Sequence, residues 1–137
     1  MVDRVSPKTR SSIMASVSSK NTGPELTIRK LLFSIGYRYK LHPRNLPGTP
    51  DIAFTKREKV IFVHGCFWHG HECKYGRLPK SRTEYWAEKI KTNRHRDKKN
   101  LRKLHDLGWQ ALVIWQCQLK NENLKDVLID FLGPTRL

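Results

Sequence analysis

Two cysteines and three histidines lie within one short stretch of the chain, from His64 to Cys73. Thiolate sulfur and imidazole nitrogen are donors that zinc takes, four at a time, in a tetrahedral set. The one other cysteine, Cys117, follows an apolar run that is typical of a buried strand. The stretch has few aliphatic residues, and bound metal can supply folding free energy where apolar packing does not. We therefore predict a zinc site formed by Cys66, Cys73, Cys117 and one of His64, His69 and His71.

The number of cysteines also limits the alternatives. An odd count of 3 argues against a disulfide framework. Buried thiols beside surface histidines are the other interpretation, and they would require all these side chains to converge by accident. A structural zinc site uses one of the three histidines, so two of them remain for other roles.

The charge of the chain indicates its partner. Lys and Arg number 27 against 12 Asp and Glu, a formal charge of +15. Such an excess favours a polyanion, and nucleic acid is the expected one, with an acidic membrane surface as the rival. No stretch approaches the ~20 apolar residues of a spanning helix, and the N-terminus lacks a signal-peptide core. We expect no membrane association and a cytoplasmic location. Basic residues crowd the segment 80–103, where we expect phosphate contacts.

The hydrophobic pattern predicts the fold class. Thr22 and Glu25 form the pattern of a capping box, and Gly36 ends the helix that follows. Further elements are predicted as strands at 37–41, 51–54, 60–63 and 109–115 and as helices at 81–107 and 121–132. The long helix makes the strands on either side of it parallel. We predict one domain over residues 1–137, of class α/β (α+β), with a mixed sheet flanked by helices. A DNA-contacting helix is expected within 1–20, and a closing helix and tail within 121–137.

A carboxylate and a spare histidine suggest hydrolysis. Asp51 follows Pro50 at the start of one strand, a place where nucleases of the PD-(D/E)xK type hold Mg²⁺. The carboxylate and lysine of that pattern's second strand are absent, because Val63 and His64 stand there. Asp51 alone is also compatible with a turn residue. A surplus histidine can serve as the base that activates water while a metal screens the phosphate. Glu25 joins such a site, closes the capping box with Thr22, or does both.

Aromatic residues suggest a contact with bases. Phe67 and Trp68 are adjacent in a polar loop, where packing of one ring in the core is the alternative to a wedge that enters the base stack. On the predicted long helix, Trp86, Lys89 and Asn93 share one face. An aromatic ring, a cation and an amide on one face form a base-reading surface.

Several segments together resemble one known family, the very-short-patch repair (Vsr) mismatch endonucleases. The resemblance runs from about Ser6 to Leu119, and its most specific motif is the stretch from His64 to Cys73. The other matching segments are 10–14, 22–25, 46–51 and 108–117.

That resemblance implies a restriction-endonuclease-like fold with a structural zinc site. It implies a nick on the 5′ side of the thymine in a G·T mismatch that arises from deaminated 5-methylcytosine. Asp51 would hold Mg²⁺ with the backbone carbonyl of Val63, where the family carries Thr. His69 would be the general base, and Glu25 and His64 would act through water at the metal or through the phosphate. Zinc would be held by Cys66, His71, Cys73 and Cys117.

The resemblance also implies how DNA is bound. Phe67, Trp68 and Trp86 would wedge into the stack from the major groove, and Met14 and Val17 would enter from the minor groove. Lys89 and Asn93 would contact the mismatch. The implied partner is double-stranded DNA with a G·T mismatch, bound by a monomer near the bacterial nucleoid. A functional link to a cytosine-5 DNA methyltransferase follows from the origin of the mismatch.

Two rival functions share part of this pattern. A sequence-specific endonuclease or nickase would cut unmodified, fully paired DNA with the same residues. A zinc-dependent DNA-binding module without catalysis would bind DNA in a salt-dependent manner. The second alternative leaves Asp51 and His69 without a role.

Overall fold

A computed structural model describes residues 22–73 and 76–135. The predicted helix within 1–20, with Met14 and Val17, lies outside the described residues. The helices are α2 (Gly23–Ile35), α3 (Thr83–Asp106) and α4 (Leu124–Leu132), with short 3₁₀ helices η1 (Thr55–Arg57) and η3 (Gln116–Lys120). The strands are β1 (Lys40–Leu41), β2 (Ile52–Phe54), β3 (Lys59–His64) and β4 (Gln110–Trp115).

The strands form one mixed sheet in the order β1-β2-β3-β4. Strand β2 pairs antiparallel with both β1 and β3, whereas β3 and β4 are parallel, from Lys59 opposite Gln110 to His64 opposite Trp115. The helix α3 is the crossover between β3 and β4, because parallel neighbours need a long connection. The predicted mixed sheet flanked by helices is confirmed.

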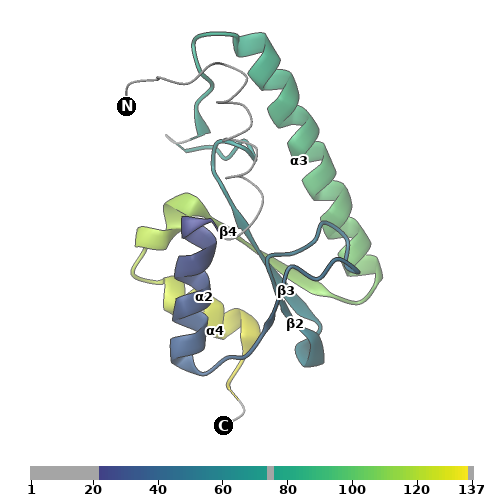
Figure 1. Ribbon diagram of the computed structural model, residues 1–137, viewed down its shortest axis with the longest axis vertical. Helices are drawn as coiled ribbons and strands as arrows, with labels where there is room; N and C mark the ends of the chain where they lie inside the picture. Colours follow the sequence, from purple (N-terminus) through teal and green to yellow (C-terminus); the bar gives the residue numbers. More distant parts are fainter. Residues whose placement is uncertain (1–21, 74–75, 136–137) are drawn as a thin grey trace.

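Helices cover both faces of the sheet, as Figure 1 shows with α2 and α4 on one side and α3 on the other. On the first face Leu32 and Leu128 belong to the same buried cluster as Ile61 of β3. On the second face Leu104 of α3 packs with Phe62. Alternate residues of β3 therefore point into two separate cores, which explains why this strand is apolar without interruption. No helix in the described ranges is long and apolar enough to cross a membrane.

The strand predicted over residues 37–41 is shorter than expected, since only Lys40 and Leu41 pair. The register sets Lys40 opposite Ala53, so Arg38 would stand opposite Thr55. The chain leaves the extended conformation at Thr55 to form η1, and no strand remains there to pair with. Tyr37 is nevertheless buried in the first core.

Several candidate site residues lie at one edge of the sheet. Asp51 comes just before β2, and β3 ends at His64. Because β2 runs antiparallel to β3 and β4 runs parallel to it, the start of β2 and the ends of β3 and β4 meet at the same edge. Topology thus brings Asp51, His64 and Trp115 together, followed by Cys117 in η3.

Candidate active site and metal centres

Four soft donors converge beyond this edge of the sheet. The donor atoms of Cys66, His71, Cys73 and Cys117 all lie within 4.8 Å of one another. None of the cysteines forms a disulfide, and Cys117 Sγ lies 3.4 Å from His71 Nδ1. Burial raises the pKa of the Cys66 thiol to about 12, and its neighbours Cys73 and Cys117 contribute. Three thiols and one imidazole at this spacing fit a tetrahedral ion that takes sulfur and nitrogen.

The loop that carries these donors packs closely on α3. Gly70 has a positive φ of 64°, and a Cβ there would lie 2.5 Å from Ile90 Cγ2. Asn93 Nδ2 donates a hydrogen bond of 2.9 Å to the carbonyl of Trp68. Close backbone approach and this side-chain bond together fix the loop against the helix.

The three aromatic residues that were predicted to wedge into DNA form one cluster. The ring of Trp86 lies 5.3 Å from that of Phe67 and 5.8 Å from that of Trp68, in edge-to-face contacts. All three side chains are half-buried, and Lys89 on the same helix is exposed. The cluster is therefore partly open to solvent, at the junction of the loop and α3.

Two histidines and an aspartate form a second group. The rings of His64 and His69 stack with centroids 3.7 Å apart and an angle of 3° between their planes. His69 Nδ1 lies 2.5 Å from Asp97 Oδ2, which comes from α3. Trp115 touches both histidines edge-on and stacks on His71 at 4.2 Å, so one ring joins this group to the cysteine cluster.

Two members of this group, His64 and Asp97, have pKa values shifted from their usual range. Burial lowers the pKa of His64 to about 4, and the adjoining His69 contributes to the shift. Burial acts to raise the pKa of Asp97, but the hydrogen bond and charge of His69 outweigh it, so the pKa of Asp97 is lowered. His64 is therefore neutral at neutral pH and Asp97 is ionised. His64 Nδ1 is buried with no hydrogen-bond partner in the described part of the chain.

A third group contains two carboxylates and a histidine. Donor atoms of Glu25, His42 and Asp51 lie within 4.8 Å of one another. Glu25 is 1% exposed, and its carboxylate oxygens lie 3.0 Å from His42 Nε2 and 3.2 Å from an Arg29 nitrogen. Asp51 Oδ2 accepts a hydrogen bond of 2.7 Å from the backbone N–H of Val63. Glu25 thus belongs to the site as well as to the start of α2, where its N–H bonds Thr22 Oγ1.

Asp51 is poorly solvated and close to another acid. Burial, with the carboxylate of Glu25 beside it, raises the pKa of Asp51 to about 7. The hydrogen bond from Val63 and the nearby His42 oppose this shift without cancelling it. A buried carboxylate and a half-buried one that share a proton form a site where a divalent cation can replace that proton.

A cavity of about 360 Å³ connects the second and third groups. Asp51, Val63, His64, His69 and Asp97 all line it, with Arg96 and Asn100 of α3 on its other side. The cavity therefore presents a carboxylate, an imidazole held by a second carboxylate, and a guanidinium to one volume. This combination suits a phosphate and a water molecule.

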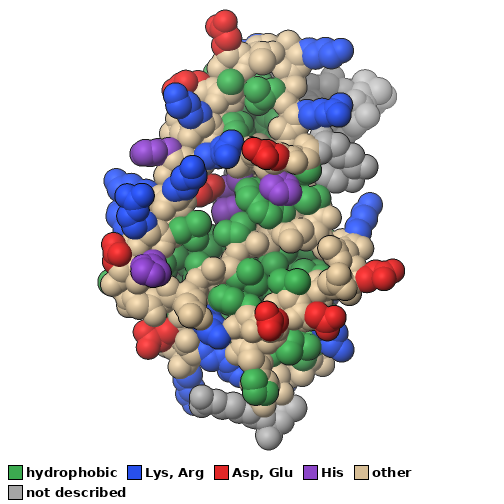
Figure 2. Space-filling view, turned by 180° about the vertical axis from the view of Figure 1, so that it is seen from behind, with side chains coloured by type: hydrophobic (Ala, Val, Ile, Leu, Met, Phe, Trp, Pro, Cys, Tyr) green, Lys and Arg blue, Asp and Glu red, His purple; other side chains and the backbone are tan. Residues whose placement is uncertain are grey.

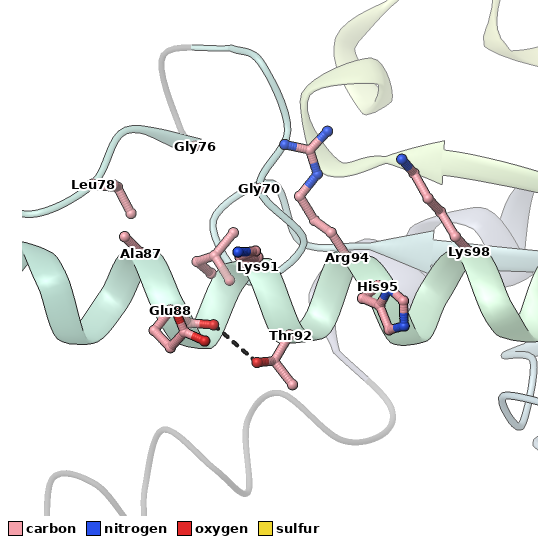
Figure 3. Close-up of a pocket in the computed structure, with 11 residues that line it drawn as sticks. Gly70, Gly76, Leu78, Ala87, Glu88, Lys91, Thr92, Arg94, His95 and Lys98 are labelled. Carbon is pink, nitrogen blue, oxygen red and sulfur yellow. Dashed lines mark hydrogen bonds between the residues drawn. The ribbon is translucent and has the colours of Figure 1, made fainter.

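A larger cavity of about 660 Å³ lies on the far flank of α3, against the loop around Gly70. In Figure 3 Arg94 and Lys98 project from one side of the helix and Thr92 and His95 from the other. The carboxylates and histidines of the three groups are absent from its lining, so we assign the chemistry to the smaller cavity. Figure 2 shows that Lys and Arg side chains are numerous along the edge that α3 forms, which suits contacts with phosphates.

Sequence reasoning missed two residues of these groups, Asp97 and His42. Asp97 had a detectable signal, because it lies seven residues from both Ile90 and Leu104, the buried residues of α3. An acid at that position of a helix faces the interior and requires a partner. His42 had no signal, since it follows the short strand β1 in an irregular segment.

Comparison with known proteins identifies the family. Residues 2–75 match the family described as DNA mismatch endonuclease Vsr. A type II nicking enzyme, V.XorIIP of Xanthomonas oryzae pv. oryzae, is 55% identical over 121 residues, which cover 88% of this chain and 89% of that protein. The chain belongs to the Vsr family of DNA mismatch endonucleases.

Two further relatives are similar to this chain over most of their length. The type II nicking enzyme V.NmeAIP of Neisseria meningitidis is 44% identical, over 89% of this chain and 87% of that protein. The DNA mismatch endonuclease Vsr of Escherichia coli is 39% identical, over 92% of this chain and 81% of that protein. Membership of the Vsr family confirms that the chain is a DNA endonuclease, and nucleases of this class use a divalent metal.

Proposed function

We propose that this endonuclease nicks one strand of duplex DNA on the 5′ side of the thymine in a G·T mismatch. The observation that carries the proposal is the shared cavity, where Asp51 and the pair formed by His69 and Asp97 face one volume. Membership of a mismatch endonuclease family supports the substrate, and the nicking enzymes among the relatives support cleavage of one strand.

Asp51 and the backbone carbonyl of Val63 are proposed to hold Mg²⁺. The donor set fits, because Asp51 is a carboxylate that is hydrogen-bonded to residue 63 and lies beside a second acid. The metal supplies positive charge that screens the scissile phosphate. Glu25 is the second carboxylate beside Asp51, and it contacts His42 and Arg29.

His69 is proposed as the general base. When the N–H at His69 Nδ1 donates a hydrogen bond to the carboxylate of Asp97, the lone pair on Nε2 remains available to take a proton from water. The water oxygen then attacks phosphorus, the bond between phosphorus and the leaving oxygen breaks, and the leaving oxygen takes a proton from solvent water. His64 stacks on His69, fixes the plane of that ring and offers its buried Nδ1 to the phosphate.

The DNA contacts are assigned to the loop, to α3 and to the N-terminal segment. Phe67, Trp68 and Trp86 would enter the base stack together, and the exposed Lys89 would contact the mismatch. Asn93 holds the carbonyl of Trp68, so its proposed contact with the mismatch requires that bond to open. Met14 and Val17 are kept as proposed minor-groove residues.

A structural zinc ion is proposed at Cys66, His71, Cys73 and Cys117. The four donors are close enough for one ion, and three of them are thiols. The ion would hold the loop that presents both the aromatic cluster and His69. The chain would act as a single-domain monomer, because one nick needs one site. We place it in the bacterial cytoplasm at the nucleoid, with a functional link to a cytosine-5 DNA methyltransferase.

Two end-labelled duplexes that differ by a single G·T mismatch test the proposal. Each is incubated with and without Mg²⁺, across several flanking sequences. A metal-dependent nick beside the mismatched thymine, in the mismatched duplex alone, supports the proposal. Cutting of both duplexes would favour a sequence-specific nickase, and binding without any cut would favour a non-catalytic zinc protein.

A further inference from the structure

His42 contacts both acidic residues of the third group. Its backbone N–H donates a hydrogen bond of 3.2 Å to the carbonyl of Asp51. Its ring Nε2 lies 3.0 Å from Glu25 Oε1. The backbone of His42 has a positive φ of 47°, a conformation that few residues other than glycine adopt. Main chain and side chain thus both place the imidazole beside Asp51.

The spacing of these atoms suits ligands of one ion. Two donors at right angles around an ion, with bonds of about 2.0–2.2 Å, lie about 3 Å apart. The separation of His42 Nε2 and Glu25 Oε1 has that value, and the nearest donor atoms of all three residues lie within 4.8 Å. Without an ion, this 3.0 Å separation is a hydrogen bond between His42 and Glu25. With an ion bound, the same separation suits two neighbouring ligands in its coordination sphere.

The other histidine group is less suitable for a metal. The lone pairs of imidazole nitrogens lie in the plane of the ring. The planes of His64 and His69 are parallel to within 3°, so their lone pairs do not meet at one ion. His64 lines the cavity beside Asp51 and its Nδ1 is buried without a partner, which independently indicates a polar ligand in that cavity.

We propose that His42 Nε2 is a direct nitrogen ligand of the catalytic divalent metal, beside the carboxylates of Asp51 and Glu25. This inference rests on the proposed metal site at Asp51 and adds a ligand that the sequence did not reveal. Mg²⁺ strongly prefers oxygen donors, whereas imidazole favours first-row transition ions. His42 therefore biases the site toward an ion such as Mn²⁺ over Mg²⁺.

The test measures Mn²⁺ bound to the full chain, with its cysteine cluster already loaded with zinc and without DNA. Electron paramagnetic resonance gives the affinity for Mn²⁺, and pulsed measurements detect magnetic coupling to ¹⁴N or to ¹⁵N-labelled histidine. The variants are His42→Gln, which keeps a polar side chain beside Glu25, and His95→Gln, a control on the exposed flank of α3. Circular dichroism and zinc content show whether each variant is folded.

We expect imidazole nitrogen coupling to Mn²⁺ in the native chain and in His95→Gln. His42→Gln should lose the coupling and weaken Mn²⁺ binding by about tenfold or more. The affinity for Mg²⁺, measured by competition, should change much less.

Bound Mn²⁺ without nitrogen coupling in the native chain would overturn the role of His42 and leave the metal site at Asp51 intact. Coupling that persists in His42→Gln would overturn it too, by assigning the nitrogen to another histidine. If Asp51→Asn binds Mn²⁺ as tightly as the native chain, the proposed metal site itself is wrong, and the inference falls with it.

Discussion

His69 Nδ1 lies 2.5 Å from Asp97 Oδ2, although the two residues are 28 positions apart in the chain. His69 belongs to the loop after β3, and Asp97 belongs to α3. The carboxylate of Asp97 is ionised because the hydrogen bond and charge of His69 lower its pKa against the effect of burial. Asp97 therefore accepts a hydrogen bond from the N–H at Nδ1 of His69, and Nε2 carries the unprotonated lone pair. This relationship fixes which nitrogen of His69 can serve as a base.

Asp97→Asn should reduce the rate of nicking while DNA binding is retained. The amide can donate to His69 Nδ1, which moves the ring proton to Nε2 and removes the base. We expect a loss of about a hundredfold to ten-thousandfold in single-turnover rate. Asp106→Asn, at the exposed end of the same helix, is the matched control. A normal rate in Asp97→Asn would remove this pair from the mechanism.

His71→Asn should release one zinc ion and destabilise the chain. The substitution removes a donor from the cluster and the stacking of His71 on Trp115. We expect the melting temperature to fall by about 10 °C or more. Metal analysis and thermal unfolding measure both effects, with His105→Asn, a 90% exposed histidine, as control. Full zinc content in His71→Asn would show that His71 is not a ligand.

Asp51→Asn should stabilise the chain at alkaline pH in buffer without added Mg²⁺ or Mn²⁺. Burial raises the pKa of Asp51 from 3.8 to about 7, so the native state binds more protons than the unfolded state between these values. The contribution of Asp51 to the free energy of unfolding is complete below its unfolded-state pKa of 3.8. That contribution is lost as the pH rises through about 7.

The advantage of Asp51→Asn should therefore grow between pH 5 and pH 8, to the order of 2 kcal/mol. His64, whose lowered pKa of about 4 costs stability as pH falls, affects both proteins alike and cancels in the difference. Chemical denaturation at several pH values measures the trend. If the difference in stability between Asp51→Asn and the native chain does not change with pH, the raised pKa of Asp51 is contradicted.

Trp68→Ala should weaken binding to mismatched DNA more than binding to paired DNA. Loss of one ring from the cluster with Phe67 and Trp86 removes stacking on an opened base step. We expect a cost of about 1–3 kcal/mol on the mismatched duplex. Phe33→Ala, a 56% exposed aromatic residue on α2, controls for loss of an exposed ring. Equal losses on both duplexes would indicate a purely structural role for Trp68.

Much of the architecture could be predicted because it follows from local patterns. The long basic helix between two apolar runs required β3 and β4 to be parallel, and that relation brought Cys117 to the loop with Cys66. The hydrophobic pattern within a segment predicted the presence of a strand better than its length. β1 is short because η1 interrupts its partner, which hydrophobic pattern does not reveal.

The candidate site was only partly predictable, for a physical reason. Asp51 and His69 belong to motifs, but their partners Asp97 and His42 come from other elements and meet them only in the folded chain. Glu25 had two possible roles in the sequence, and the structure places it in both, with its backbone at the helix cap and its carboxylate in the site. The groups that position a catalytic residue are distant in sequence, so geometry was needed to find them.

Cleavage of DNA at a G·T mismatch can be measured by competition between two substrates. A G·T duplex and the matching A·T duplex are placed in one tube, with a different dye on each thymine strand, so that enzyme and metal are shared. We predict that the G·T duplex is nicked on the 5′ side of its thymine well before any product appears from the A·T duplex. Equal rates for the two duplexes would contradict recognition of the mismatch.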